Sequence, residues 1–202
     1  MKNLLVIMPL AALLLTGCGE SAANSPAQTS SQAATAEATP TASATPTKSK
    51  SPRGNTLAAF GETRSLALAS TKEALLSFTV KELVPITCDY PSDMSPSNGQ
   101  VMGVLVDIET TPALADDANL SQGLIVNALS FKHIKAEGTT TGTLSTNMIY
   151  NCLTDRSQFM PDEIGPAEKV SGMVLVDVPS PATGTLIFEP LQGGDKYEYV
   201  VK

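Results

Sequence analysis

Beyond residue 55, apolar residues alternate with polar ones in a series of short runs. A period of two places successive side chains on opposite faces of a strand, so each run predicts a strand with one buried face. Segments rich in Pro, Gly, Asn and Asp separate the runs and favour turns. The expected strands span residues 64–69, 74–84, 101–109, 124–134, 148–153, 170–178, 186–188 and 197–201. This spacing, without βαβ alternation, predicts an all-β antiparallel sandwich for residues 56–202.

The alternation also predicts which side chains face the core between two sheets. The apolar parity includes Phe78, Val104, Val106, Val174 and Val176. The opposite parity carries charges that are costly to bury without partners, namely Lys81, Asp107 and Asp177. We therefore expect the first set to be buried and the second set to lie in solvent or near strand ends.

Two segments between the clearest runs carry weaker patterns. Leu129 and Phe131 are two residues apart, so we expect them on one face of the strand at 124–134. Residues 113–120 can form a single helical turn.

The N-terminus has the features of a bacterial secretion signal. Lys2 precedes an almost wholly apolar stretch at 4–15, which is too short to span a bilayer as a helix. The stretch ends in Leu-Thr-Gly-Cys, which resembles a lipobox with Cys18 as the lipidated residue. We expect cleavage after residue 17 and fatty acyl chains on Cys18, since two chains anchor a protein stably. The alternative is an ordinary signal peptide with Cys18 as a bystander.

Residues 18–55 are expected to form a disordered tether. Ala, Ser, Thr and Pro dominate this stretch, and from residue 21 to 55 it contains no Leu, Ile, Val, Phe, Tyr or Met. It cannot bury enough apolar surface to offset the entropy of ordering. Lys48, Lys50 and Arg53 form a small basic cluster at its end, which we interpret as solvated, with a lipid or wall-anion contact as the alternative.

The net charge of the chain limits the kinds of partner that it can be expected to bind. The chain has 20 acidic and 13 basic residues, a net charge of -7 and a pI near 4.7. A nucleic-acid binder needs a basic face, so we do not expect this chain to bind nucleic acid. Residues 56–202 hold 18 of the acidic residues and 9 of the basic ones.

Cys88 and Cys152 remain as a pair once Cys18 is assigned to lipid. A lipid-anchored domain lies outside the cytoplasm, where disulfides persist. We expect a structural disulfide, because the Cys-x-x-Cys spacing of redox pairs is missing. A redox pair or two free thiols are the alternatives.

Three of the expected strands resemble the pattern of a bacterial lipoprotein family, mainly Gram-positive, whose C-terminal immunoglobulin-like domain has no known function. The matching segments are 99–109, the Phe-containing 130–138 that ends in a Gly turn, and 170–179, which has the form Val-x-Gly-x-Val and ends in Val-Pro. The resemblance covers about residues 60–201. It implies an immunoglobulin-like sandwich of about 7–8 strands, similar in fold to a secreted mycobacterial immunoprotective antigen, on the cell surface. It implies no reaction and no catalytic residues.

His133 is the only histidine, so any His-dependent catalysis must use it. It could activate Ser130 or Ser145, with Asp107 or Asp177 orienting the ring. No nucleophile-elbow motif accompanies these residues, and we expect a packed or rim histidine instead.

One acidic segment is a weak candidate for Ca²⁺. Asp116, Asp117 and Asn119 offer three oxygen side chains, but the spacing of an EF-hand loop is missing. We expect a solvated acidic loop, with no cofactor and no metal.

Together these features predict a lipid-anchored binding module that faces outward from the cell membrane. Its partner would be an envelope protein or a cell-wall polymer, in addition to the membrane lipid held through Cys18. The alternative is an envelope hydrolase or metal-dependent enzyme that uses His133 with nearby carboxylates.

Overall fold

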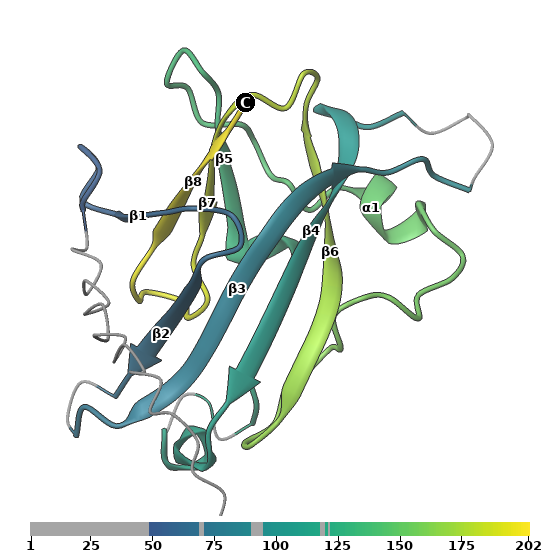
Figure 1. Ribbon diagram of the computed structural model, residues 1–202. Helices are drawn as coiled ribbons and strands as arrows, with labels where there is room; N and C mark the ends of the chain where they lie inside the picture. The colour runs from purple at the N-terminus through teal and green to yellow at the C-terminus, as the bar shows by residue number, and fades with distance from the viewer. Residues whose placement is uncertain (1–48, 69–70, 90–94, 118–119, 121) are drawn as a thin grey trace, which may run out of the picture. The chain divides into compact units, whose positions relative to one another are not determined.

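A computed structural model describes residues 49–68, 71–89, 95–117, 120 and 122–202 of the chain (Figure 1). These residues form an all-β sandwich of two four-stranded sheets, as the alternation predicted. In chain order the strands are β1 (Thr56–Ala58), β2 (Thr63–Ala67), β3 (Ala74–Pro85), β4 (Gly99–Thr110), β5 (Phe131–Ile134), β6 (Lys169–Pro179), β7 (Gly184–Phe188) and β8 (Tyr197–Val201). The predicted leader, Cys18 and the predicted tether up to residue 48 lie outside the described residues.

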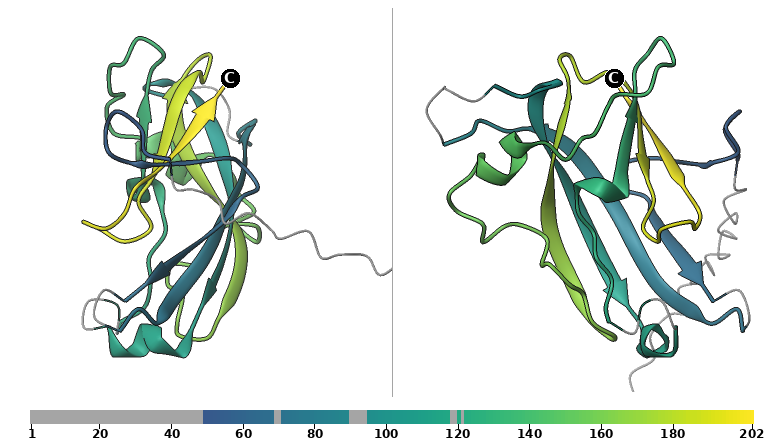
Figure 2. Two further views of the ribbon diagram at one scale, coloured as in Figure 1. Left: turned by 60° about the vertical axis from the view of Figure 1, so that its left-hand side comes forward. Right: turned by 180° about the vertical axis from the view of Figure 1, so that it is seen from behind.

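The two sheets differ in the length of their strands. The short-strand sheet has the order β1-β8-β7-β5, and the long-strand sheet has the order β2-β3-β4-β6. All neighbouring strands are antiparallel except β1 and β8, which are parallel. Figure 2 shows that β3, β4 and β6 continue past the end of the short-strand sheet, toward the 3₁₀ helix η1 (Pro112–Asp116). This helix overlaps the first half of the segment 113–120, where a helical turn was predicted.

The core lies between the two sheets, where the predicted apolar parity points. Phe78, Val104, Val106, Val174 and Val176 are all buried, with at most 5% of any of them exposed. Phe78 joins the sheets through edge-to-face ring contacts with Phe188 and Tyr197 of the short-strand sheet, at 5.1 and 4.8 Å between ring centroids. Aromatic pairs at this separation add to the burial energy.

The outward parity is confirmed for Lys81 and Asp107 but needs correction for Asp177. Lys81 and Asp107 lie half-exposed on the outer face of the long-strand sheet and form an ion pair of 2.8 Å. Asp177 also points outward, yet its side chain is fully buried. It accepts hydrogen bonds from the backbone N–H groups of residues 97–98 and from the Thr146 hydroxyl. Two loops therefore cover this end of β6 and supply the donors that a buried carboxylate needs.

The prediction of a strand at 148–153 is wrong, because the helix α1 (Asn147–Asn151) occupies most of this segment. Met148, Ile149 and Cys152 are buried, whereas Tyr150 is exposed. Burial at positions i, i+1 and i+4 follows one face of a helix and not the two-residue period of a strand.

The expected strand at 124–134 is shorter than predicted, because only residues 131–134 form β5. A 3₁₀ turn, η2 (Ala128–Ser130), precedes it, and Leu129 is 66% exposed while Phe131 is buried. Asn127 and Ser130 bond reciprocally across the turn, from the Leu129 N–H to the Asn127 side chain and from the Asn127 N–H to the Ser130 hydroxyl. This capping box fixes a turn, so Leu129 and Phe131 do not share a face.

The last residues of the expected tether are ordered and pack on β8. Ser51 and Asn55 both donate hydrogen bonds to one oxygen of the Glu198 carboxylate, at 2.9 and 2.7 Å. Arg53 pairs with its other oxygen at 3.5 Å, and Lys50 donates to the hydroxyl at the start of β1. These contacts bury Glu198 and correct the predicted domain boundary, which placed the start of the folded domain at residue 56.

Candidate functional site

Cys88 and Cys152 form a disulfide, which confirms the structural pairing. Cys88 follows the end of β3, and Cys152 directly follows α1. The N–H of Asp89 donates to the Cys152 carbonyl at 2.7 Å, so the backbone is also joined at this point. The bridge fixes α1 and its flanking loops to the long-strand sheet.

His133 lies in the core and not at a surface. It stands in β5 opposite Leu186 of β7, and no part of its side chain is exposed. Its Nδ1 atom forms a hydrogen bond of 2.8 Å with the Thr141 hydroxyl. Burial lowers the pKa of His133 below its ordinary value of 6.5, although the nearby backbone of Thr183 acts in the opposite direction. The folded protein therefore favours the neutral ring.

The residues that could have acted with His133 are engaged elsewhere. Ser130 accepts a hydrogen bond within its own turn, and Ser145 pairs with the Tyr150 hydroxyl. Asp107 and Asp177 both belong to the long-strand sheet, each with the partners described above, whereas His133 belongs to the short-strand sheet. The described residues thus do not assemble the catalytic group that the sequence allowed.

The acidic candidates for Ca²⁺ are only partly described. Asp116 is the last residue of η1, Asp117 follows it and donates its N–H to the Leu114 carbonyl, and Asn119 lies outside the described residues. In residues 49–202, excluding the undescribed gaps, no three His, Cys, Asp or Glu side chains are grouped as metal ligands.

A hollow of about 690 Å³ lies beside β5. We call it the β5 hollow, and its walls include Ile125, Leu129, Ser130, Lys132 and the loop 189–194 between β7 and β8. Its size is within the range of ligand sites. Ile125 and Leu129 both line this hollow and are 58% and 66% exposed, so two large aliphatic side chains are open to solvent there.

Glu189 and Lys132 both line the β5 hollow, but only Glu189 forms an ion pair with a described residue. Glu189 accepts a hydrogen bond of 2.6 Å from the Gly193 N–H and pairs with Lys196 at 3.5 Å. Lys132 forms no ion pair with any residue that the structure describes. Sequence reasoning missed this site, because Leu129 was expected to share one strand face with Phe131, which is buried.

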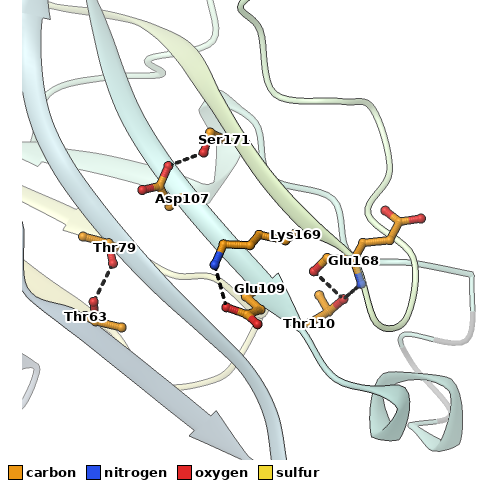
Figure 3. A network of polar contacts seen from close by, with 8 residues as sticks. All are labelled: Thr63, Thr79, Asp107, Glu109, Thr110, Glu168, Lys169 and Ser171. Atoms are coloured by element: carbon orange, nitrogen blue, oxygen red, sulfur yellow. Dashed lines mark hydrogen bonds and ion pairs between the residues drawn. The ribbon is translucent and has the colours of Figure 1, made fainter. Parts of the chain in front are cut away.

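The lower outer face of the long-strand sheet is a polar surface with internal partners (Figure 3). Thr63 and Thr79 share a hydrogen bond of 2.8 Å across β2 and β3. Ser171 donates to Asp107 at 2.6 Å, and Lys169 pairs with Glu109 at 3.3 Å. The polar groups of each pair bond to one another across the strands, as on an ordinary solvated sheet face.

Comparisons with known proteins give no assignment for this site. No protein family matches the chain, and searches among curated proteins and among solved structures also find no match. None of the helices in the described part of the chain is long and apolar enough to cross a bilayer. The geometry of the cavities is therefore the basis on which function must be inferred.

Proposed function

We propose that this chain is a lipid-anchored binding module of the outer cell-membrane surface, with the β5 hollow as the contact for an envelope protein. The observation that carries the proposal is the exposure of Ile125 and Leu129 at the mouth of this hollow. Burying one such side chain fully contributes about 1.5–3 kcal/mol. An apolar patch on a protein gains this energy, whereas a polar wall polymer does not.

The anchor in this proposal is Cys18. Its lipobox and the apolar stretch before it support acylation, and two acyl chains are sufficient for stable attachment. The resemblance to Gram-positive lipoproteins supports the same location. Catalysis at His133 is not part of the proposal, because the ring is buried and bonds to Thr141.

In-cell cross-linking of the full lipoprotein tests the contact site. We expect the double variant Ile125→Ser, Leu129→Ser to lose the cross-linked partner, which mass spectrometry identifies in the unaltered protein. Val200→Ser is the matched control, because Val200 is 60% exposed but lies on β8 and outside the hollow. An equal yield of the same cross-linked product from the double variant would contradict the contact site.

A further inference from the structure

The edge of β6 that faces away from β4 has an opening at Leu175. In an antiparallel ladder, the backbone groups of every second residue point toward the same neighbour. The N–H groups of Met173 and Asp177 point away from β4, because they donate to the carbonyls of Gln158 and Leu144. Leu175 lies midway between them in a ladder without bulges, so its N–H and C=O also point away from β4.

No residue in the described part of the chain bonds to these two groups of Leu175. Residues 158–160 pair with Met173 on this edge, and they can approach closely because a Cβ atom on Gly172 would lie only 2.6 Å from the Met160 nitrogen. The chain then continues into Pro161 without pairing with the next positions of β6. Leu175 is only 5% exposed, and buried backbone groups without a partner are rare and costly.

A cavity of about 130 Å³ lies in front of this opening. Its apolar lining includes Val126, Ile149, Phe159, Met160, Met173 and Leu175. A single water needs about 10–15 Å³ of such space, so one water is too small to fill this cavity. We call the opening at Leu175 and this cavity the β6 notch.

The rim of the β6 notch carries an arginine without an acidic partner. The guanidinium of Arg156 lies 5.6 Å above the Phe159 ring centroid and donates to the Tyr150 carbonyl. No carboxylate among the described residues forms an ion pair with it, although Asp162 also lines the cavity. The domain is acidic overall, so a cation held in place without a carboxylate favours a negatively charged ligand.

We propose that the β6 notch binds an extended segment of a partner protein through one pair of main-chain hydrogen bonds at Leu175. The segment pairs with the N–H and C=O of Leu175, places one large apolar side chain in the cavity and brings a carboxylate to Arg156. A donor and an acceptor side by side at a strand edge match the main chain of a polypeptide, and main-chain hydrogen bonds of this kind supply affinity when extended peptides bind at sheet edges. This goes beyond the proposed function, because the notch shares only Asn127 with the lining of the β5 hollow.

The chain's own tether does not fit this site. Residues 21–55 contain no Leu, Ile, Val, Phe, Tyr or Met, so they offer no side chain that fills an apolar cavity of this size. The occupant is therefore a segment from another protein.

The probes for this test are fluorescent peptides of the form acetyl-Thr-Val-Glu-Z-Glu-Val-Thr-amide, where Z is Leu, Ile, Val, Met, Phe or Tyr. Fluorescence anisotropy measures their binding to the mature lipoprotein in nanodiscs, with empty nanodiscs as the blank. We expect at least one peptide to bind saturably and to slow amide hydrogen exchange at Leu175. N-methylation of Z removes one backbone donor and should weaken binding about tenfold.

Charge variants test the role of Arg156. Arg156→Gln should weaken binding and abolish the preference for Glu over Gln in the peptide. Lys169→Gln is the matched control, because Lys169 is an exposed cation at the start of β6 and does not line the notch. The double variant of the β5 hollow, Ile125→Ser with Leu129→Ser, should bind the peptides as the unaltered protein does, so the two sites fail or succeed separately.

Three results would overturn peptide binding at the β6 notch. One is the lack of saturable binding by all of the peptides, together with unchanged exchange at Leu175, which would mean a cavity that holds only water. Another is equal affinity of the N-methylated peptide. The third is protection of Leu175 that depends on protein concentration without any peptide, which would make a second copy of this chain the occupant.

Discussion

Two buried carboxylates show how single residues depart from the strand pattern. Asp177 and Glu198 are almost wholly buried, and donors from loops surround each of them. The two-residue period gave the correct parity for Asp177, but the donors that cover it come from residues up to 80 positions away. Because periodicity carries information only about neighbours in sequence, it could not predict that loops close over this strand end.

Replacing Asp177 by Asn should destabilise the fold. The amide keeps the shape but loses the charge and turns one acceptor into a donor that faces other donors. We expect the free energy of unfolding to fall by about 2–3 kcal/mol, measured by urea denaturation under oxidising conditions. Asp107→Asn is the matched control and should cost under about 1 kcal/mol, because the ion pair of Asp107 is half-exposed. Equal losses for the two variants would contradict this account of Asp177.

His133 should make stability depend on pH. Burial holds its pKa in the folded state below the ordinary value of 6.5, so the unfolded chain takes up a proton first on acidification. The free energy of unfolding contributed by His133 is therefore complete above about pH 6.5 and falls as pH drops below that value, by at most about 1.4 kcal/mol per pH unit.

The measurement is urea denaturation between about pH 7.5 and 5.5, above the range where ordinary carboxyl groups titrate. His133→Gln keeps a side chain that can bond to Thr141 and should remove this slope, whatever its effect on stability at neutral pH. A slope that is the same in the variant would assign the pH dependence to other groups.

At the scale of elements, the sequence predicted the long strands well, and it also placed the short strands β2, β7 and β8 within about two residues of their observed ends. β3, β4 and β6 were found within about two residues of their observed ends, because long alternating runs carry a repeated signal. β1 was missed, since three residues show no period and its partner β8 is at the other end of the domain. α1 was taken for a strand, because a single helical turn offers few positions for comparison. The β6 notch is lined by residues of α1 and of the segment that follows it, which the strand pattern did not predict. Sequence alone therefore could not reveal the notch.

The disulfide should hold α1 in place. In the native protein, Cys88 and Cys152 should resist alkylation until a reductant is added, as mass spectrometry can show. Removing both with Cys88→Ser and Cys152→Ser should lower the free energy of unfolding by about 4 kcal/mol in the chain-entropy account. Hydrogen exchange should quicken in α1 and in the segment after β3, while β7 stays protected as the internal control. Ready labelling of both cysteines in the untreated protein would refute the bridge.

At the scale of the whole molecule, charge and attachment have to be considered together. Residues 56–202 hold 18 acidic and 9 basic residues, so anionic lipid repels the domain. One of the basic residues next to the domain, Arg53, already pairs with Glu198 within the fold. Electrostatic attraction therefore does not hold this domain at a membrane, and the proposed location depends on the lipid at Cys18.

Cys18→Ser should release the protein from membranes or leave it with an uncut leader. The serine hydroxyl cannot take the thioether-linked lipid, and the acidic domain has no other membrane attraction to replace two acyl chains. Fractionation of cells followed by intact-mass measurement distinguishes the two forms. Ser21→Ala, three residues further along, is the control and should stay in the membrane fraction with its mass increased by acyl chains. A correctly cleaved Cys18→Ser protein that still sediments with membranes would show that another part of the chain provides the anchor.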